Sequence, residues 1–155
     1  MNLIHVDVAI IGAGTAGMGA YQAARAHTDS VLLIEGGVYG TTCARVGCMP
    51  SKLLIAAAEA AHQARHADPF GVHVKGVIVD GTAVMARVRR ERDRFVGFVL
   101  ESVDSFPQND RLIAKVRFQD ANTLLTEQGQ SIHARCIVIA TGSSPILPPL
   151  LKDLS

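Results

Sequence analysis

Cysteine is scarce in this sequence, with three residues among 155. A secreted scaffold held together by disulfides would carry cysteines at a higher density and in an even number, so a reducing compartment is expected. Zinc sites usually combine two closely spaced ligand pairs, and no second cysteine pair accompanies Cys43 and Cys48. We therefore expect no bound metal, and we expect any disulfide in this chain to be functional rather than structural.

Long apolar runs and an excess of one charge are also missing. No uninterrupted apolar run reaches the roughly 18 residues that cross a bilayer, and Asp7 interrupts the N-terminal run 6–11, which does not resemble a signal peptide. The formal net charge of +1 gives no overall attraction to nucleic acid or membranes. The arginine-rich segment 86–95 also contains Glu91 and Asp93, which predicts a solvated helix face. These features predict a soluble, cytoplasmic protein without nucleic-acid or membrane partners.

The order of the apolar segments predicts an α/β fold. A composition of 48% hydrophobic and 19% charged residues fits one globular domain. Residues 6–11 are nearly all apolar, as in a strand buried on both faces of a parallel sheet, and a helix at 16–26 and a strand at 30–35 complete a βαβ unit. Residues 52–67 and 83–103 predict two further helices. The later segments that predict short strands are 111–120, 122–127, 130–134 and 135–142.

Three glycines mark the first predicted turn. Gly12, Gly14 and Gly17 form a G-x-G-x-x-G pattern, which allows a tight turn, the close approach of a pyrophosphate, and close packing of helix on strand. Glu35 ends the next predicted strand 18 positions after Gly17, where a carboxylate can accept hydrogen bonds from a ribose. This βαβ context favours a dinucleotide site over a glycine turn without a ligand.

The segment GTTCARVGCMPSK, residues 40–52, holds two cysteines five positions apart. A disulfide that closes so short a loop stabilises less than the roughly 3 kcal/mol of a 15-residue loop. In a regular α-helix, the Cα atoms of residues i and i+5 lie roughly 8.6 Å apart, beyond the roughly 7 Å limit for a disulfide. The turn around Cys43 and Cys48 must therefore be distorted, aided by Gly47 and Pro50. An easily reduced bridge beside a helix N-terminus predicts a redox centre.

Two further features favour ordinary structural roles. His62 and His66, four positions apart, predict a solvated helix face rather than metal ligands. Cys136 lies in an apolar, strand-like run, which predicts a buried and unreactive side chain.

Three motifs, read together, resemble the flavin-dependent pyridine nucleotide-disulfide oxidoreductases, and within them the dihydrolipoamide dehydrogenases. They are GAGTAG with Glu35, the cysteine segment 40–52, and CIVIATGSSP at 136–145, in the family's order and over essentially the whole chain. The resemblance implies that residues 1–155 are the N-terminal part of a Rossmann-like FAD-binding domain, with a parallel sheet, flanking helices and a small β-meander. Family members are about three times as long. We therefore expect a fragment that lacks the NAD-binding domain, the rest of the FAD domain, and the dimer-interface domain with the catalytic base.

The resemblance also implies roles for individual residues. The three glycines of the turn would hold the pyrophosphate of FAD, and the Glu35 carboxylate would bind its adenosine ribose. Thr42 and Lys52 would lie beside the flavin, and Thr141 and Gly142 would line the site. Cys48 would be the thiol next to the flavin and form the charge-transfer thiolate, and Cys43 would exchange with the substrate. The implied cofactor-binding residues are Gly12, Gly14, Gly17, Glu35, Thr42, Lys52, Thr141 and Gly142.

The activity implied by the resemblance is that of a dihydrolipoyl dehydrogenase. Dihydrolipoamide would reduce the Cys43–Cys48 disulfide, and electrons would pass through FAD to NAD in a homodimeric full-length enzyme, whereas the fragment alone is expected to be inactive in turnover. Three alternatives remain open. They are a mercuric reductase or another disulfide reductase of the family, a nucleotide-binding module with idle cysteines, and a flavin-free thiol-disulfide protein.

Four positions depart from the family pattern. The chain has Gly40-Thr41-Thr42-Cys43 where the family usually has Gly-Gly-Thr-Cys. It has Ala44-Arg45 in place of Leu-Asn, and Gly36 follows Glu35 where lysine is usual. We expect these differences to tune the flavin environment rather than abolish binding.

Overall fold

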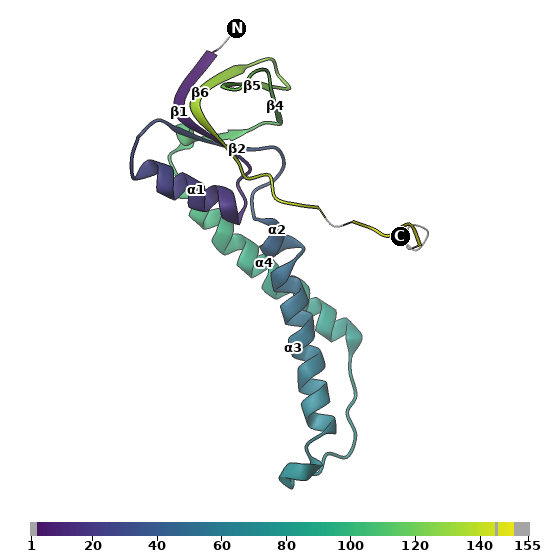
Figure 1. The fold of residues 1–155 in the computed structure, drawn as a ribbon. Helices are drawn as coiled ribbons and strands as arrows, with labels where there is room; N and C mark the ends of the chain where they lie inside the picture. The colour runs from purple at the N-terminus through teal and green to yellow at the C-terminus, as the bar shows by residue number, and fades with distance from the viewer. Residues whose placement is uncertain (1–2, 145, 151–155) are drawn as a thin grey trace.

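A six-stranded sheet is built around the N-terminal strand (Figure 1). The computed structural model describes residues 3–144 and 146–150. Strand β1 (Leu3–Ile11) pairs in parallel with β2 (Val31–Glu35) and β6 (Ser131–Ile139), and β2 pairs in parallel with β3 (Arg111–Ile113). Within the described residues, the strand order is β3-β2-β1-β6-β5-β4. β1 begins before the predicted residue 6 because its first residues pair with the start of β6.

The C-terminal strands confirm the predicted β-meander and correct two strand boundaries. β4 (Val116–Phe118) and β5 (Thr123–Thr126) join β6 as antiparallel neighbours. The prediction of one strand at 111–120 was wrong, because its first part pairs with β2 and its second part with β5, at opposite edges of the sheet. The prediction of two strands at 130–134 and 135–142 was also wrong. They form the single strand β6, which β1 pairs along nearly its whole length.

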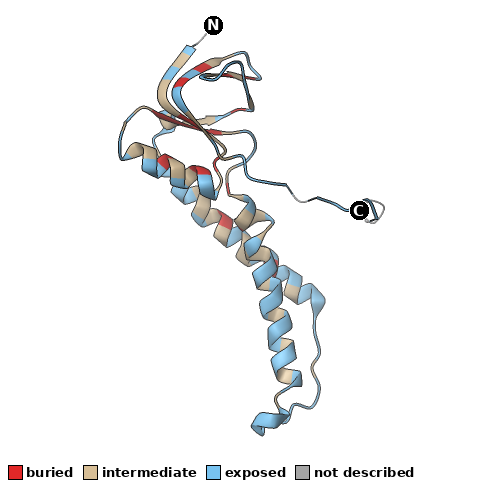
Figure 2. Cartoon of the chain, viewed as in Figure 1, coloured by how far each residue is buried: buried red, intermediate tan, exposed pale blue. Residues whose placement is uncertain are grey.

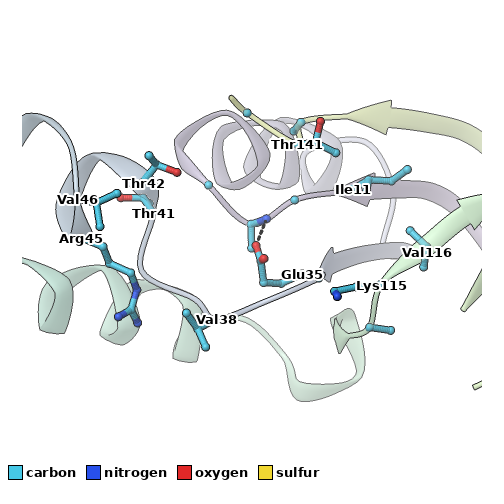
Figure 3. Close-up of a pocket in the computed structure, with 17 residues that line it drawn as sticks. Ile11, Glu35, Val38, Thr41, Thr42, Arg45, Val46, Lys115, Val116 and Thr141 are labelled. Atoms are coloured by element: carbon cyan, nitrogen blue, oxygen red, sulfur yellow. Dashed lines mark hydrogen bonds between the residues drawn. The ribbon is translucent and has the colours of Figure 1, made fainter. Parts of the chain in front are cut away.

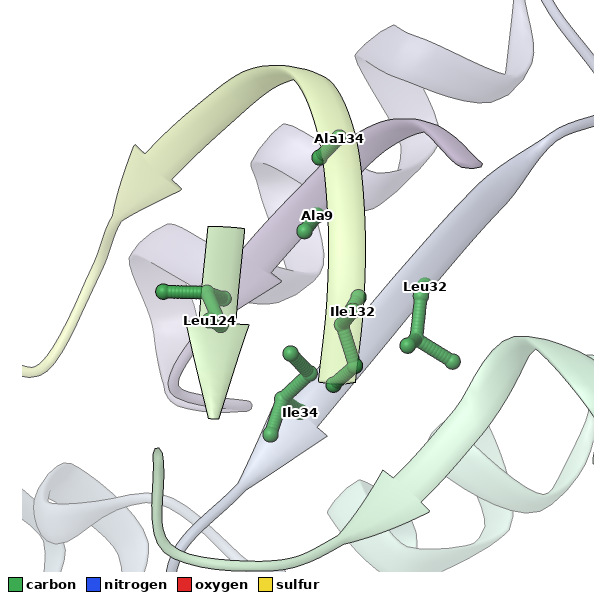
Figure 4. Packing of buried hydrophobic residues seen from close by; sticks show 6 residues of the cluster. All are labelled: Ala9, Leu32, Ile34, Leu124, Ile132 and Ala134. Atoms are coloured by element: carbon green, nitrogen blue, oxygen red, sulfur yellow. The ribbon is translucent and has the colours of Figure 1, made fainter. Parts of the chain in front are cut away.

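Apolar side chains fill both faces of the sheet, as the continuous apolar strands predict. Leu124 of β5 belongs to the first cluster, so the meander closes over that face of β1 and β2. On the other face, α1 (Thr15–Arg25) packs on Ile10 and Leu33 through Tyr21. The first cluster, shown in Figure 4, comprises Ala9, Leu32, Ile34, Leu124, Ile132 and Ala134.

Tyr21 connects α1 to the segment before β3. Its hydroxyl donates a hydrogen bond to Oδ2 of Asp110, at 2.6 Å, in the short helix η2 (Gln108–Asp110), and its ring stacks on Phe106. Burial, together with the Asp110 carboxylate, raises the pKa of Tyr21 to about 12. The hydroxyl therefore stays protonated and continues to donate at any ordinary pH.

The remaining helices form a hairpin that extends away from the sheet (Figures 1 and 2). α2 (Thr42–Arg45) leads into α3 (Cys48–Arg65), which is followed by η1 (Asp68–Phe70) and α4 (Gly81–Asp104). Both long predicted helices are confirmed, with α3 starting earlier than residue 52. No residue of α3 is buried, so this helix derives little stability from the sheet. Among the described helices, none combines the length and the apolar character that crossing a bilayer requires.

Candidate functional site

Two glycines of the G-x-G-x-x-G turn are required by packing. Gly12 has φ 103°, and a Cβ atom at this position would overlap the carbonyl group of Ala140 at the end of β6. A Cβ atom at Gly17 would overlap the carbonyl oxygen of Gly12. Only glycine therefore lets α1 approach the strand ends this closely, as the pattern predicts.

The third glycine, Gly14, faces open space. It is the N-cap of α1, no side chain caps the helix there, and a Cβ atom on Gly14 would have no neighbour within 4 Å. The first N–H groups of a helix need partners from outside the helix, and they favour a negative charge. The structure thus leaves room for an anionic ligand at the position where the sequence predicts a pyrophosphate.

Glu35 lies beside the glycine turn at the end of β2 (Figure 3). Its Oε2 atom accepts a hydrogen bond of 2.9 Å from the backbone N–H of Ala13, and its Oε1 atom accepts one of 2.9 Å from the N–H of Gly37. These two bonds fix the orientation of the carboxylate. Each carboxylate oxygen keeps further acceptor capacity for hydroxyl groups of a ligand.

A cavity of about 520 Å³ lies over the turn, within the range of roughly 300–1,000 Å³ that is usual for small-molecule sites. It is lined by the β1–α1 turn, the end of β2, the segment around α2, the β3–β4 connection and the residues after β6. Gly17 packs beneath the turn instead of lining the cavity, and Lys52, Cys43 and Cys48 do not line it. The predicted cofactor-binding residues that do line it are Gly12, Gly14, Glu35, Thr42, Thr141 and Gly142.

Sequence reasoning did not assign a cofactor-binding role to several other residues at this cavity. Figure 3 shows Arg45 and Thr41 on one side of Glu35 and Lys115 on the other, and Ala114 also lines the cavity. Arg45 and Thr41 could have been identified, because they depart from the family pattern beside the first cysteine. The β3–β4 connection could have been identified only from the parallel pairing of β3 with β2, which places it beside Glu35.

The two cysteines lie on different helices, as the argument for a distorted turn predicts. α2, with Cys43, ends at Arg45, and α3 begins at Cys48. Gly47 between them makes the close approach possible, since a Cβ atom there would lie 3.2 Å from the carbonyl oxygen of Thr42 and 3.6 Å from the Cα atom of Cys43. The corner at Gly47 thus replaces the regular helix that would keep the two thiols apart.

Cys43 and Cys48 are not joined by a disulfide in this structure. Cys43 is half-buried and Cys48 is exposed. Hydrogen bonding to the Cys48 side chain, with burial as a smaller cause, raises the pKa of the Cys43 thiol above its usual value. The raised pKa favours the protonated form of the Cys43 thiol.

Two other sequence predictions are tested by side-chain exposure. The prediction that Cys136 is buried was wrong: it lies on β6 opposite Val8, and no described element covers its side chain. His62 and His66 stack on each other at the surface of α3, as predicted. No group of three or more potential metal ligands occurs among the residues that the structure describes.

The arginine-rich segment of α4 is confirmed as a solvated face. Its guanidinium groups pair at the surface with Glu91 and Asp93, at N–O distances of 2.7–3.4 Å. Exposed pairs of this kind contribute roughly 0–1 kcal/mol each to stability.

Comparisons with known proteins agree with the geometry. The sequence profile described as pyridine nucleotide-disulphide oxidoreductase matches residues 6–153. A dihydrolipoyl dehydrogenase of Chlamydia muridarum is 38% identical over 145 residues, which cover 90% of this chain and 30% of the relative. A mercuric reductase of Shigella flexneri is 37% identical over 158 residues, which cover 96% of this chain and 28% of the relative.

A solved structure supports the same fold. The HOCl-induced flavoprotein disulfide reductase RclA from Escherichia coli, as a Cu(II) complex, superposes with a TM-score of 0.67 at 26% identity. The match covers 96% of this chain and 31% of that protein. The chain therefore spans about a third of the length of the proteins it matches.

Proposed function

Because the chain belongs to the pyridine nucleotide-disulphide oxidoreductase family, we propose that it binds FAD in the cavity over the glycine turn and carries a redox-active thiol pair, Cys43 and Cys48. The observation that carries this proposal is the position of Gly14. It lies at an uncapped helix N-terminus, lines a cavity, and has empty space where its side chain would be. In the proposal, residues 1–155 are the N-terminal part of an FAD-binding domain.

The residues of the cavity fit a dinucleotide. The N–H groups at the start of α1 would bind the pyrophosphate, and the Glu35 carboxylate would accept hydrogen bonds from the ribose hydroxyl groups. Thr42, Thr141 and Gly142 would line the flavin side of the same cavity. Lys52 is exposed on α3 and does not line the cavity, so its proposed place beside the flavin rests on the family resemblance alone. When bound, FAD supplies a two-electron acceptor.

The thiol pair would perform thiol-disulfide exchange with a dithiol substrate. In its oxidised form, Cys43–Cys48, the pair accepts attack by a substrate thiolate on the sulfur of Cys43, and the sulfur of Cys48 leaves. The second substrate thiol then displaces Cys43 from the mixed disulfide, so that the substrate becomes a disulfide and both cysteines become thiols. Cys48 is the first residue of α3, where the helix N-terminus favours the negative charge of a leaving thiolate.

Dihydrolipoamide is the proposed substrate, and NAD the proposed final acceptor, in a longer homodimeric enzyme. The dihydrolipoyl dehydrogenase of C. muridarum supports this choice by its 38% identity. The 37% identity to the mercuric reductase of S. flexneri supports the second candidate, in which the same thiol pair serves mercuric reduction. Turnover with dihydrolipoamide and NAD, as opposed to Hg(II) and a nicotinamide, distinguishes the two in the longer enzyme.

The cofactor proposal is tested by FAD retention in a matched pair of variants. Gly14→Ala places a methyl group in the open space of the turn, where it contacts no protein atom but obstructs the pyrophosphate. Gly19→Ala adds the same methyl group on the exposed side of α1, also without a neighbour within 4 Å. We expect the wild type and Gly19→Ala to retain FAD through desalting, and Gly14→Ala to bind at least about tenfold more weakly. Equal FAD affinity in all three proteins would contradict the proposed site.

A further inference from the structure

Thr41 adopts a backbone conformation that β-branched residues rarely tolerate. Its φ is 56° and its ψ 146°, and it has the only positive φ among the non-glycine residues that the structure describes. Such conformations persist only where the surrounding structure imposes them, and they concentrate at functional positions. Thr41 lies two residues before Cys43, where the pattern GGTC would place a glycine.

Two sets of hydrogen bonds hold Thr41 in this conformation. Its hydroxyl oxygen accepts a hydrogen bond of 3.0 Å from the N–H of Ala44, and its carbonyl oxygen accepts one of 3.1 Å from the N–H of Arg45. The Arg45 guanidinium then reaches back over the chain and donates from Nε to the carbonyl oxygen of Tyr39, at 2.7 Å. Gly40 makes room for this arginine, since a Cβ atom there would lie 2.5 Å from its Nε atom.

Cys43 lies inside this hydrogen-bonded segment. The Thr41 hydroxyl caps a helix of one turn, α2, whose second residue is Cys43. At the other end of the turn, the N–H of Val46 donates a hydrogen bond of 3.0 Å to the carbonyl oxygen of Thr42. α2 has no other side-chain cap, and it is too short to be stable by its own hydrogen bonds. The Thr41 hydroxyl thus holds the N-terminal end of the helical turn that carries Cys43.

We propose that Thr41 is a positioning residue, whose hydroxyl sets the dithiol–disulfide equilibrium of Cys43 and Cys48 by holding α2 in place. The inference rests on the proposed redox role of the pair. Holding two reacting groups together raises their effective concentration. In a glutathione buffer the reaction is Cys43-SH and Cys48-SH plus oxidised glutathione, which gives the intramolecular disulfide and two reduced glutathiones. Loss of the cap loosens α2, separates the thiols and lowers the equilibrium constant for disulfide formation.

The test uses the whole chain without flavin, equilibrated in glutathione buffers, quenched by alkylation and analysed by mass spectrometry. For Thr41→Ala we expect the equilibrium constant to fall about fivefold, a shift of about 20 mV toward a less negative potential at 29.6 mV per tenfold change. Thr41→Ser keeps the hydroxyl and should remain within twofold of the wild type. Asp80→Ala is the matched control, because the Asp80 carboxylate caps α4 by accepting a hydrogen bond of 2.9 Å from Ala83 N–H, outside the cysteine segment. It should leave the equilibrium unchanged.

The outcomes separate this inference from the proposed function. An unchanged potential in Thr41→Ala, or an equal shift in Thr41→Ser or Asp80→Ala, overturns the positioning role. If Thr41→Ala fails to fold, a shift in Thr41→Val, which keeps the branched shape without the hydroxyl, supports the inference and its absence contradicts it. FAD retention by the wild type is measured in parallel, so a failure of the cofactor proposal appears there and leaves the thiol equilibrium as an independent result.

Discussion

The glycine turn and the cysteine turn lie next to each other but are held in place by different interactions. The glycine turn is set by packing: Gly12 and Gly17 each lie directly against backbone atoms, over the fully buried side chains of Ile10 and Leu33. The cysteine turn is held mainly by hydrogen bonds between near neighbours in the sequence. Changes at Gly12 and Gly17 should therefore affect whether the protein folds, whereas changes to the cysteine turn should affect what the thiols do in a folded protein.

The largest effect is expected for Gly17→Ala, which breaks the packed region. The added methyl group overlaps the carbonyl oxygen of Gly12, and backbone atoms cannot move aside without displacing α1 from the sheet. We expect a loss of roughly 3 kcal/mol or more in the free energy of unfolding, measured by urea denaturation. Gly19→Ala on the same helix should instead stabilise the protein, by up to about 1 kcal/mol. Equal stabilities of the two variants would show that packing does not set this turn.

A smaller effect is expected for Tyr21→Phe, which keeps the packing but removes one hydrogen bond to Asp110. The expected loss is roughly 1 kcal/mol near neutral pH. Because the pKa of Tyr21 is raised from 10.0 to about 12, its contribution to stability is complete below about pH 10 and is lost as the pH rises through about 12. The difference in unfolding free energy between wild type and Tyr21→Phe should therefore shrink over that range. A difference that stays constant up to pH 12 would argue against the hydrogen bond.

The smallest effect on stability is expected in the cysteine turn, for Gly47→Ala. The added methyl group would lie 3.2 Å from the carbonyl oxygen of Thr42, which must shift by a few tenths of an ångström. We expect a loss of roughly 1 kcal/mol or less, but a clear change in the chemistry of Cys43. The pKa of its thiol is raised by contact with Cys48, so separating the two should move the midpoint of Cys43 alkylation to lower pH.

Gly97→Ala in α4, where the added methyl group has no atom within 4 Å, provides the control for Gly47→Ala. It should leave the alkylation midpoint where it is in the wild type. A large loss of stability in Gly47→Ala, without any change at Cys43, would mean that the cysteine turn is also held by packing.

This contrast explains which features the sequence could predict. Periodic apolar segments and required glycines follow from local rules, so the βαβ unit, both long helices and the meander are confirmed. The division of residues 111–118 between two edges of the sheet depends on long-range pairing, which no local pattern encodes. The exposure of Cys136 likewise depends on which element covers β6, and an apolar run alone does not specify that.

The cysteine turn was predictable only in part. Its distortion followed from the spacing of the two cysteines, but the positive φ of Thr41 and the bond from Arg45 to Tyr39 arise from residues that fit no simple pattern. The roles of the site residues toward FAD, and the assignment of residues 1–155 to part of an FAD-binding domain, stay predictions until a cofactor is bound.

The most direct test of the account is the absorbance spectrum of the chain, loaded with FAD and desalted, before and after a limited dose of a dithiol. The account predicts that flavin is retained and that the dithiol produces a new long-wavelength band, which is present in Cys43→Ser without added dithiol and absent in Cys48→Ser. Such a band requires the Cys48 thiolate to lie against the oxidised flavin, and so joins the two turns in one site. Retained flavin with no new band in any of these proteins would contradict the account, because the cavity and the thiol pair would then be separate features.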